Sequence, residues 1–145
     1  TLLLILFLAS CANACVFPTI VKEYGAGWGY YTNLNAETTG TDGTTIKALA
    51  FTDWAFHLDP SSSAVTATVT LQGSNNMTDW FSLYYKVDNS NTEANTAITL
   101  SASTTERMYQ ISNWQTYRYL RSNVTGYSAG TLSGTFYGRA LRGNT

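Results

Sequence analysis

The side chains that could support hydrolytic chemistry centre on His57, the only histidine of the chain. Asp53 and Asp59 flank it in the sequence, and the many serines could supply the nucleophile of a Ser-His-Asp triad. No nucleophile elbow or oxyanion-hole motif lies next to His57 in the sequence. We therefore predict that the protein is not an enzyme and has no catalytic residues.

Metal chemistry has equally little support. The nine acidic residues are scattered singly, without a paired acid and base. The loop at 88–93, DNSNTE, lacks the dense acidic spacing of a calcium loop. Cys11 and Cys15 are the only cysteines, and two thiols make an incomplete metal site. We predict no metal site and no cofactor, and we interpret the cysteines as small buried hydrophobes, with a disulfide as the alternative in an oxidising compartment.

Composition excludes one large class of partners. The 145 residues include eight basic and nine acidic side chains, and charged residues make up 12% of the chain. A nucleic-acid-binding protein needs a basic surface, so we expect no nucleic-acid partner. Ten Tyr, four Trp and six Phe, together with abundant Thr, Ser, Asn and Gly, favour strands and tight turns.

The elements that must position these side chains are predicted from alternation of apolar and polar residues. Trp54, Phe56 and Leu58 share one face of a strand, opposite Asp53, Ala55 and His57. Similar alternation, broken by turns about every ten residues, predicts further strands at 65–71, 81–87, 98–100, 107–111, 117–124 and 131–140. We predict an all-β fold: a single antiparallel β-sandwich, jelly-roll or immunoglobulin-like, over residues 24–145.

Two segments near the start of the sandwich are predicted to be irregular, and several aromatic residues are candidates for contacts with partners. The stretch YGAGWGYY at 24–31 alternates Gly with aromatics, so we expect a flexible connection that carries large apolar side chains. Residues 33–43 are polar and turn-forming, so we expect a hairpin or a loop there. Trp80 is expected to anchor the core, and Arg118 to stack on an aromatic ring or pair with a carboxylate. The candidate contact aromatics are Trp28, Tyr30, Tyr31, Trp114 and Tyr127.

Residues 1–23 form a separate apolar segment with three interpretations. The first is an arm that assembles against other subunits through Leu2, Leu3, Leu4, Ile5, Leu6, Phe7 and Leu8. The second is a signal segment, because LASC at 8–11 is similar to a bacterial lipobox, with Cys11 as the lipidated residue. The third, a membrane span, is disfavoured because polar residues and Pro18 interrupt the run.

Two β-sandwich families carry motifs that this chain resembles. The segments TLQGSNNMTDW (70–80) and YRYLRSNVTG (117–126) resemble the Q-G-S-N-D-G-x-x-W and R-Y-x-R segments of small phage virion proteins. They also resemble the discoidin, or coagulation-factor C-type, module, a jelly roll that binds sugars or lipid head groups. The resemblance covers about Val65 to Ala140, and Asn76-Met77 replaces the usual Asp-Gly.

The phage resemblance implies a non-enzymatic virion protein, a homo-oligomer that decorates or cements a capsid or tail in many copies. Its partners would be other virion subunits. The alternative is a lipid-anchored or exported surface module of the bacterial envelope that binds carbohydrate on exposed aromatics and contacts a membrane only if Cys11 is lipidated. A third hypothesis is a surface filament subunit that donates its arm as a strand to a neighbour.

Overall fold

Most of the long strands coincide with segments in which apolar and polar residues alternate. The computed structural model describes residues 22–23, 27–60, 64–88 and 90–140. Its elements are β1 (Lys22–Glu23), β2 (Trp28–Glu37), β3 (Ile46–Lys47), the 3-10 helix η1 (Ala48–Ala50), β4 (Asp53–Asp59), β5 (Val65–Ser74), β6 (Phe81–Ser82), β7 (Tyr85–Val87), β8 (Glu93–Ala94), β9 (Ile98–Ser103), β10 (Arg107–Ile111), the 3-10 helix η2 (Trp114–Thr116), β11 (Tyr119–Ala129) and β12 (Leu132–Arg139).

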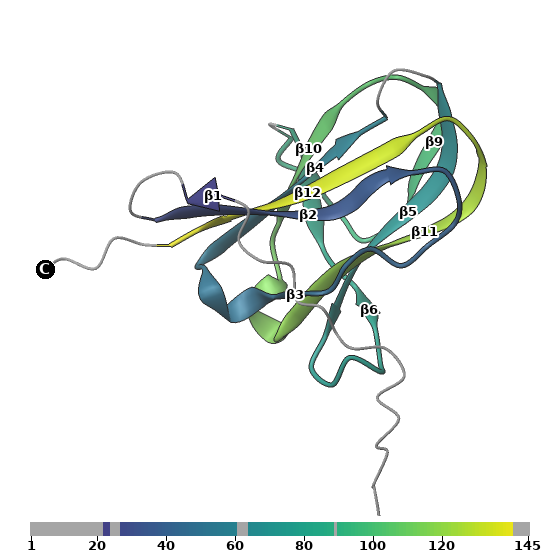
Figure 1. Ribbon diagram of the computed structural model, residues 1–145. Helices are drawn as coiled ribbons and strands as arrows, with labels where there is room; N and C mark the ends of the chain where they lie inside the picture. Colours follow the sequence, from purple (N-terminus) through teal and green to yellow (C-terminus); the bar gives the residue numbers. More distant parts are fainter. Residues whose placement is uncertain (1–21, 24–26, 61–63, 89, 141–145) are drawn as a thin grey trace, which may run out of the picture.

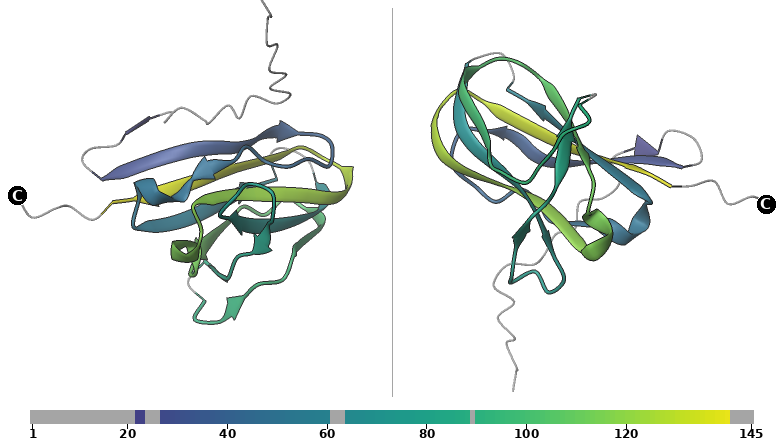
Figure 2. Two further views of the ribbon diagram at one scale, coloured as in Figure 1. Left: turned by 90° about the horizontal axis from the view of Figure 1, so that it is seen from below. Right: turned by 180° about the vertical axis from the view of Figure 1, so that it is seen from behind.

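The strands pack as two layers. In the part of the chain that the structure describes, sheet A has the order β1-β2-β12-β4-β10-β7-β8, and sheet B has the order β3-β11-β5-β6, with β9 also pairing with β5. All of these pairs are antiparallel. Figures 1 and 2 show the two sheets stacked face to face. The predicted all-β sandwich is therefore confirmed.

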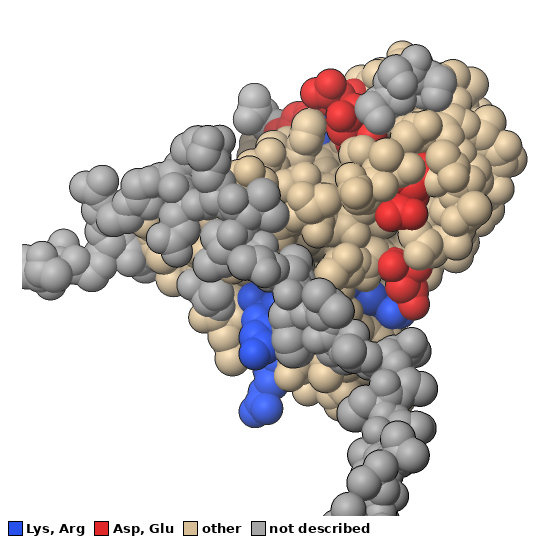
Figure 3. Space-filling model, in the orientation of Figure 1, with Lys and Arg blue, Asp and Glu red and all other residues tan. Residues whose placement is uncertain are grey.

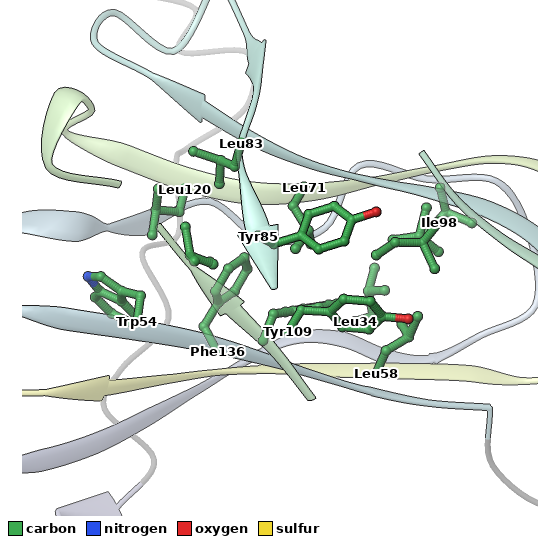
Figure 4. Packing of buried hydrophobic residues seen from close by; sticks show 14 of the residues in the cluster. Leu34, Trp54, Leu58, Leu71, Leu83, Tyr85, Ile98, Tyr109, Leu120 and Phe136 are labelled. Carbon is green, nitrogen blue, oxygen red and sulfur yellow. The ribbon is translucent and has the colours of Figure 1, made fainter. Parts of the chain in front are cut away.

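The core lies between the sheets and is filled by every second residue of the long strands. Trp54, Phe56 and Leu58 of β4 are each no more than 1% exposed, as their alternation predicts. They belong to one buried cluster with Val69, Leu71 and other inward residues of sheet B. Figure 4 shows Trp54 and Leu58 on one side of this cluster and Leu71 and Leu120 on the other. Burying a side chain of this size contributes about 1.5–3 kcal/mol, so this inner layer supplies most of the drive to fold.

One buried polar contact joins the two layers. Asn33 of β2 is 3% exposed and Ser122 of β11 is fully buried. The Ser122 hydroxyl donates to Asn33 Oδ1 at 2.5 Å, and Asn33 Nδ2 donates to the Thr44 carbonyl at 2.6 Å. Because every polar atom of this pair has a partner, the contact avoids the penalty of an unsatisfied buried group and links β2 to β11.

Gly29 lies in a strand and allows close packing, which corrects the predicted flexible connection for residues 28–31. Residues 24–26 of that stretch lie outside the described part of the chain. β2 begins at Trp28, and Gly29 pairs with Gly138 of β12. The Phe51 ring packs against both glycines: an added Cβ would lie 2.7 Å from Phe51 Cζ at Gly29 and 2.4 Å from Phe51 Cδ2 at Gly138. Glycine inside a strand often marks such a close approach. The predicted loop at 33–43 is also shorter, because β2 continues to Glu37.

The predicted strand at 81–87 is two strands in different sheets. β6 pairs with β5 in sheet B, whereas β7 pairs with β10 in sheet A. The chain crosses between the layers at Leu83, which is 1% exposed, and Phe81 is 57% exposed rather than inward-facing. Alternation predicts which residues share a face, but it does not show where a chain leaves one sheet for another.

The close approach of Phe51 to Gly138 leads to a double-mutant test. Gly138→Ala should lower the free energy of unfolding by about 1–3 kcal/mol, because the new methyl group overlaps the ring. In a Phe51→Ala background the same substitution should cost less than about 1 kcal/mol. Chemical denaturation of the four proteins measures both values. Additive costs would show that the ring does not set the requirement for glycine.

The ionisation of Tyr109 predicts how stability responds to alkali. Burial, with a smaller contribution from nearby Tyr85, raises the pKa of Tyr109 to about 12. Between pH 10 and pH 12 the unfolded chain therefore releases this proton before the folded chain does, so the free energy of unfolding falls as pH rises. The loss should be about 1–2 kcal/mol, with allowance for solvent screening, and Tyr109→Phe should remove it. Equal pH slopes for the two proteins would contradict the assignment.

Candidate functional site

The outer face of sheet A brings together an aromatic ring and an ion pair from three strands. Arg139 of β12 pairs in register with Trp28 of β2 on one side and with Asp53 of β4 on the other. Its Nε and Nη2 donate to Asp53 Oδ2 at 2.9 and 2.6 Å. Its Cζ lies 5.7 Å from the centre of the Trp28 ring. Both charged side chains are about half exposed, so the pair organises the surface more than it stabilises the fold.

A hollow of about 290 Å³ lies beside this ion pair. Trp28, Tyr137 and Met108 give it apolar walls, and the neighbouring Ala55 lies at an outward position of β4. Its polar lining comes from Asp53, Arg139, Gln110 and Asp88. Asp88 is itself paired with Arg107, at 3.0 Å. The lining therefore mixes apolar and polar groups without an unpaired charge.

A second surface is apolar and lies at one end of the sandwich, around η1, η2 and β6 (Figure 1). We call Leu49, Phe81 and Tyr84 the apolar end; they are 71%, 57% and 43% exposed. Phe81 stacks on Tyr117, just after η2, with ring centres 6.2 Å apart. The Tyr84 backbone N–H donates to Asn113 Oδ1, just before η2, at 2.7 Å. These contacts connect the Phe81 ring and the Tyr84 backbone to residues that flank η2.

Basic side chains border the apolar end. Lys47, Leu49, Arg118 and Tyr119 line a shallow hollow of about 250 Å³. In Figure 3 blue side chains extend from the lower part of the face shown, whereas acidic side chains lie higher and to the right. The Arg118 guanidinium pairs with no carboxylate among the described residues. The prediction that Arg118 pairs with a carboxylate is therefore wrong for this part of the chain.

The arginine that is paired on sheet B is Arg121. Its Nη1 donates to Asp42 Oδ2 at 2.6 Å and its Nε to Gln72 Oε1 at 2.9 Å. Its Cζ lies 4.0 Å from the centre of the Trp80 ring. Trp80 is partly exposed beneath this guanidinium and is absent from the buried cluster of the described residues, so the prediction that it anchors the core is wrong.

Comparison with known proteins supports the fold. No protein-family model and no curated protein match the chain. Among solved structures, the crystal structure of SPBc2 prophage-derived protein YomS is similar to it, with a TM-score of 0.62 and 12% sequence identity. The similarity covers 77% of this chain and 91% of YomS. At this identity it is evidence for a shared fold, and it agrees with the predicted β-sandwich.

The candidate contact aromatics separate into two groups. Trp28 is 50% exposed, and Tyr30 and Tyr127 are partly exposed. Tyr31 and Trp114 are 7% and 8% exposed, so the prediction that these two contact partners is wrong. Side chains alternate between the two faces of β2, so Tyr31 faces inward while its neighbour Tyr30 is partly exposed. Tyr31 packs on Trp54, with ring centres 5.7 Å apart. Trp114 belongs to the buried core cluster.

The other predicted residues lie outside the described part of the chain. These are the arm residues Leu2, Leu3, Leu4, Ile5, Leu6, Phe7 and Leu8, and the candidate lipidation site Cys11. Lys22 and Glu23, the last two residues of the predicted N-terminal segment 1–23, form β1 and pair with β2. No described helix is long and apolar enough to cross a membrane. Within the described residues, no three His, Cys, Asp or Glu side chains are grouped to hold a metal ion.

Sequence reasoning missed several surface residues and one motif. Tyr137 and Arg139 alternate with the inward Phe136 and Gly138, so the sequence indicates that they face outward, but it does not indicate their neighbours on other strands.

Residues 126–130, GYSAG, match the G-x-S-x-G pattern of a nucleophile elbow. That elbow requires a turn from a strand into a helix, whereas this segment leads from β11 to β12. The pattern therefore belongs to a hairpin here.

The contacts of Arg121 predict a larger role in stability than those of Arg107. The Arg121 side chain is 16% exposed, so Arg121→Gln should lower the free energy of unfolding by about 1–2 kcal/mol. Arg121→Lys should recover part of this loss, because it keeps the charge but not the planar guanidinium over Trp80. Arg107→Gln is the control: its pair with Asp88 is half exposed and should contribute less than about 0.5 kcal/mol. Equal losses in chemical denaturation would contradict this ranking.

Proposed function

We propose that this chain is a non-enzymatic structural protein of a phage virion, which decorates or cements a capsid or tail in many copies. The observation that carries the proposal is the fold shared with the SPBc2 prophage-derived protein YomS, over 91% of that protein. The phage-like segments at 70–80 and 117–126 support it independently, because they belong to the resemblance in sequence and not to the structural comparison. The proposed location is the virion.

The apolar end is the surface that we assign to contacts with other virion subunits. Leu49, Phe81 and Tyr84 leave large apolar areas in water, and removing such a side chain from water yields about 1.5–3 kcal/mol. Interface cores are enriched in aromatic residues, such as Phe81 and Tyr84 here, and they are surrounded by a polar rim, which Lys47 and Arg118 supply at this end. The Phe81 ring is already stacked on Tyr117 and the Tyr84 backbone is bonded to Asn113, so docking needs little further ordering of these two residues.

Repetition makes such a small surface sufficient. A decoration protein present in many copies meets both a lattice and its own neighbours, so several modest contacts act together. The apolar segment at 2–8 would add a further contact with a neighbouring subunit, as expected for an arm. The chain would then act as a homo-oligomer on the particle.

The proposal is tested on phage particles produced by the host that carries this gene. Purified particles should contain the wild-type chain in many copies, measured by quantitative mass spectrometry and by gold-labelled antibody in electron microscopy. Leu49→Asp should reduce the copy number by roughly tenfold or more, because a charge in a buried apolar contact costs at least about 1.4 kcal/mol. Absence of the wild-type chain from the particles would overturn the proposal.

Two controls make the result specific. Thr99→Asp places a charge at an exposed position of β9, away from the apolar end, and should leave the copy number unchanged. Circular dichroism should show that both variants are folded.

The intact mass of the particle-bound chain then separates the arm from the signal hypothesis: a retained 2–8 segment supports the arm, whereas a chain that begins at an acylated Cys11 supports the envelope lipoprotein.

A further inference from the structure

We propose that the hollow on the outer face of sheet A binds a neutral saccharide ring. The site consists of Trp28, Asp53, Ala55, Met108, Tyr137 and Arg139, with Gln110 on its polar side. This inference goes beyond the virion role and does not depend on it. Of these residues, the sequence alone indicates Trp28 as a contact aromatic, and Asp53 only as a neighbour of His57.

The apolar part of the hollow matches one face of a pyranose. Trp28 is 50% exposed and Met108 is 39% exposed, so both leave apolar surface in water at the mouth of the hollow. Tyr137 adds a second ring, held 6.0 Å from the ring of Tyr30. A pyranose presents a face of C–H groups that packs against an aromatic ring. Docking there removes apolar area on both partners from water.

The polar part matches the hydroxyl groups around such a ring. Arg139 uses Nε and Nη2 on Asp53 Oδ2, which leaves Arg139 Nη1 as a donor and Asp53 Oδ1 as an acceptor without a partner among the described residues. The Gln110 amide supplies a donor and an acceptor and makes no side-chain hydrogen bond to the described part of the chain. A hydroxyl group both donates and accepts, so it suits neighbouring donors and acceptors.

The charges favour a neutral ligand over an anion or a cation. Arg139 is balanced by Asp53, and Asp88 is balanced by Arg107. A phosphate or sulfate group would meet the two lining carboxylates, and an ammonium group would meet the guanidinium of Arg139. The site thus lacks the net charge that binds ionic ligands, while its hydrogen-bonding capacity remains.

The size and rigidity of the hollow agree with this ligand class. Its volume of about 290 Å³ lies at the small end of ligand pockets, which suits one or two sugar rings. Its residues lie on paired strands rather than on loops, and Trp28, Arg139 and Asp53 are held side by side by register. Phe51 packs against Gly29 and Gly138, which are the chain neighbours of Trp28 and Arg139. The site is therefore formed before the ligand arrives.

The experiment is a titration of the isolated full chain with methyl glycosides of glucose, galactose, mannose, rhamnose and N-acetylglucosamine, up to about 50 mM. In ¹H–¹⁵N correlation spectra at least one sugar should shift the indole resonance of Trp28 and the backbone resonances of Gln110 and Arg139. Trp28→Ala and Arg139→Gln should each weaken that binding roughly tenfold or more. Phe81→Ala is the matched control, since it removes a similarly exposed ring on sheet B and should leave affinity unchanged.

Three outcomes would overturn the proposal. The first is that no sugar of the panel shifts these resonances. The second is that Phe81→Ala weakens binding as much as Trp28→Ala does. The third is that the Trp28 resonance changes with protein concentration alone, which would make the hollow an interface between copies. Failure of the virion role is distinguishable, because a chain absent from particles could still bind sugar through Trp28, and a chain present on them could fail to do so.

Discussion

Register between β4 and β12 is the constraint on which the rest of this molecule depends. Phe136 lies opposite Phe56, and their ring centres are 4.7 Å apart in the layer between the sheets. A slip of one residue would turn Phe136 outward and bring Tyr137 or Thr135 into the core, because side chains alternate strictly along a strand. Each large side chain lost from the core costs several kcal/mol, which is comparable to the whole stability of a small domain. The packing of the inner face thus selects one alignment.

That alignment also determines the outer face, although the outer residues contribute little to folding. When Phe136 and Gly138 face inward, Tyr137 and Arg139 must face outward, and pairing then places Arg139 between Trp28 and Asp53. The outer positions can vary without loss of the core, so chemistry can be placed there at small cost to stability. The hollow with mixed apolar and polar lining is a consequence of how the inner layer packs.

The two candidate surfaces have different physical character and different places in the fold. The apolar end is built around η2 and exposes large side chains bordered by Lys47 and Arg118, which suits another protein surface. The hollow of sheet A is formed by paired strands and combines rings with balanced charges, which suits a small neutral ligand. Because they share no residues, assembly and ligand binding could proceed at once on a single copy. A particle covered with such copies would present many weak sugar sites together, and multivalency would strengthen them.

The sequence by itself determined the all-β class, the strand at 107–111 and the inward faces of β4 and β5, because alternation is a local property that burial of one face imposes on each strand. It did not show that the 81–87 segment crosses between sheets, that Gly29 makes room for Phe51, or that Tyr31 and Trp114 are buried. Those outcomes depend on contacts between segments that are far apart in the sequence, and no local pattern contains that information. The outer hollow is the clearest case: Trp28, Asp53 and Arg139 come from three separate parts of the chain, and only the pairing of β2, β12 and β4 brings them together.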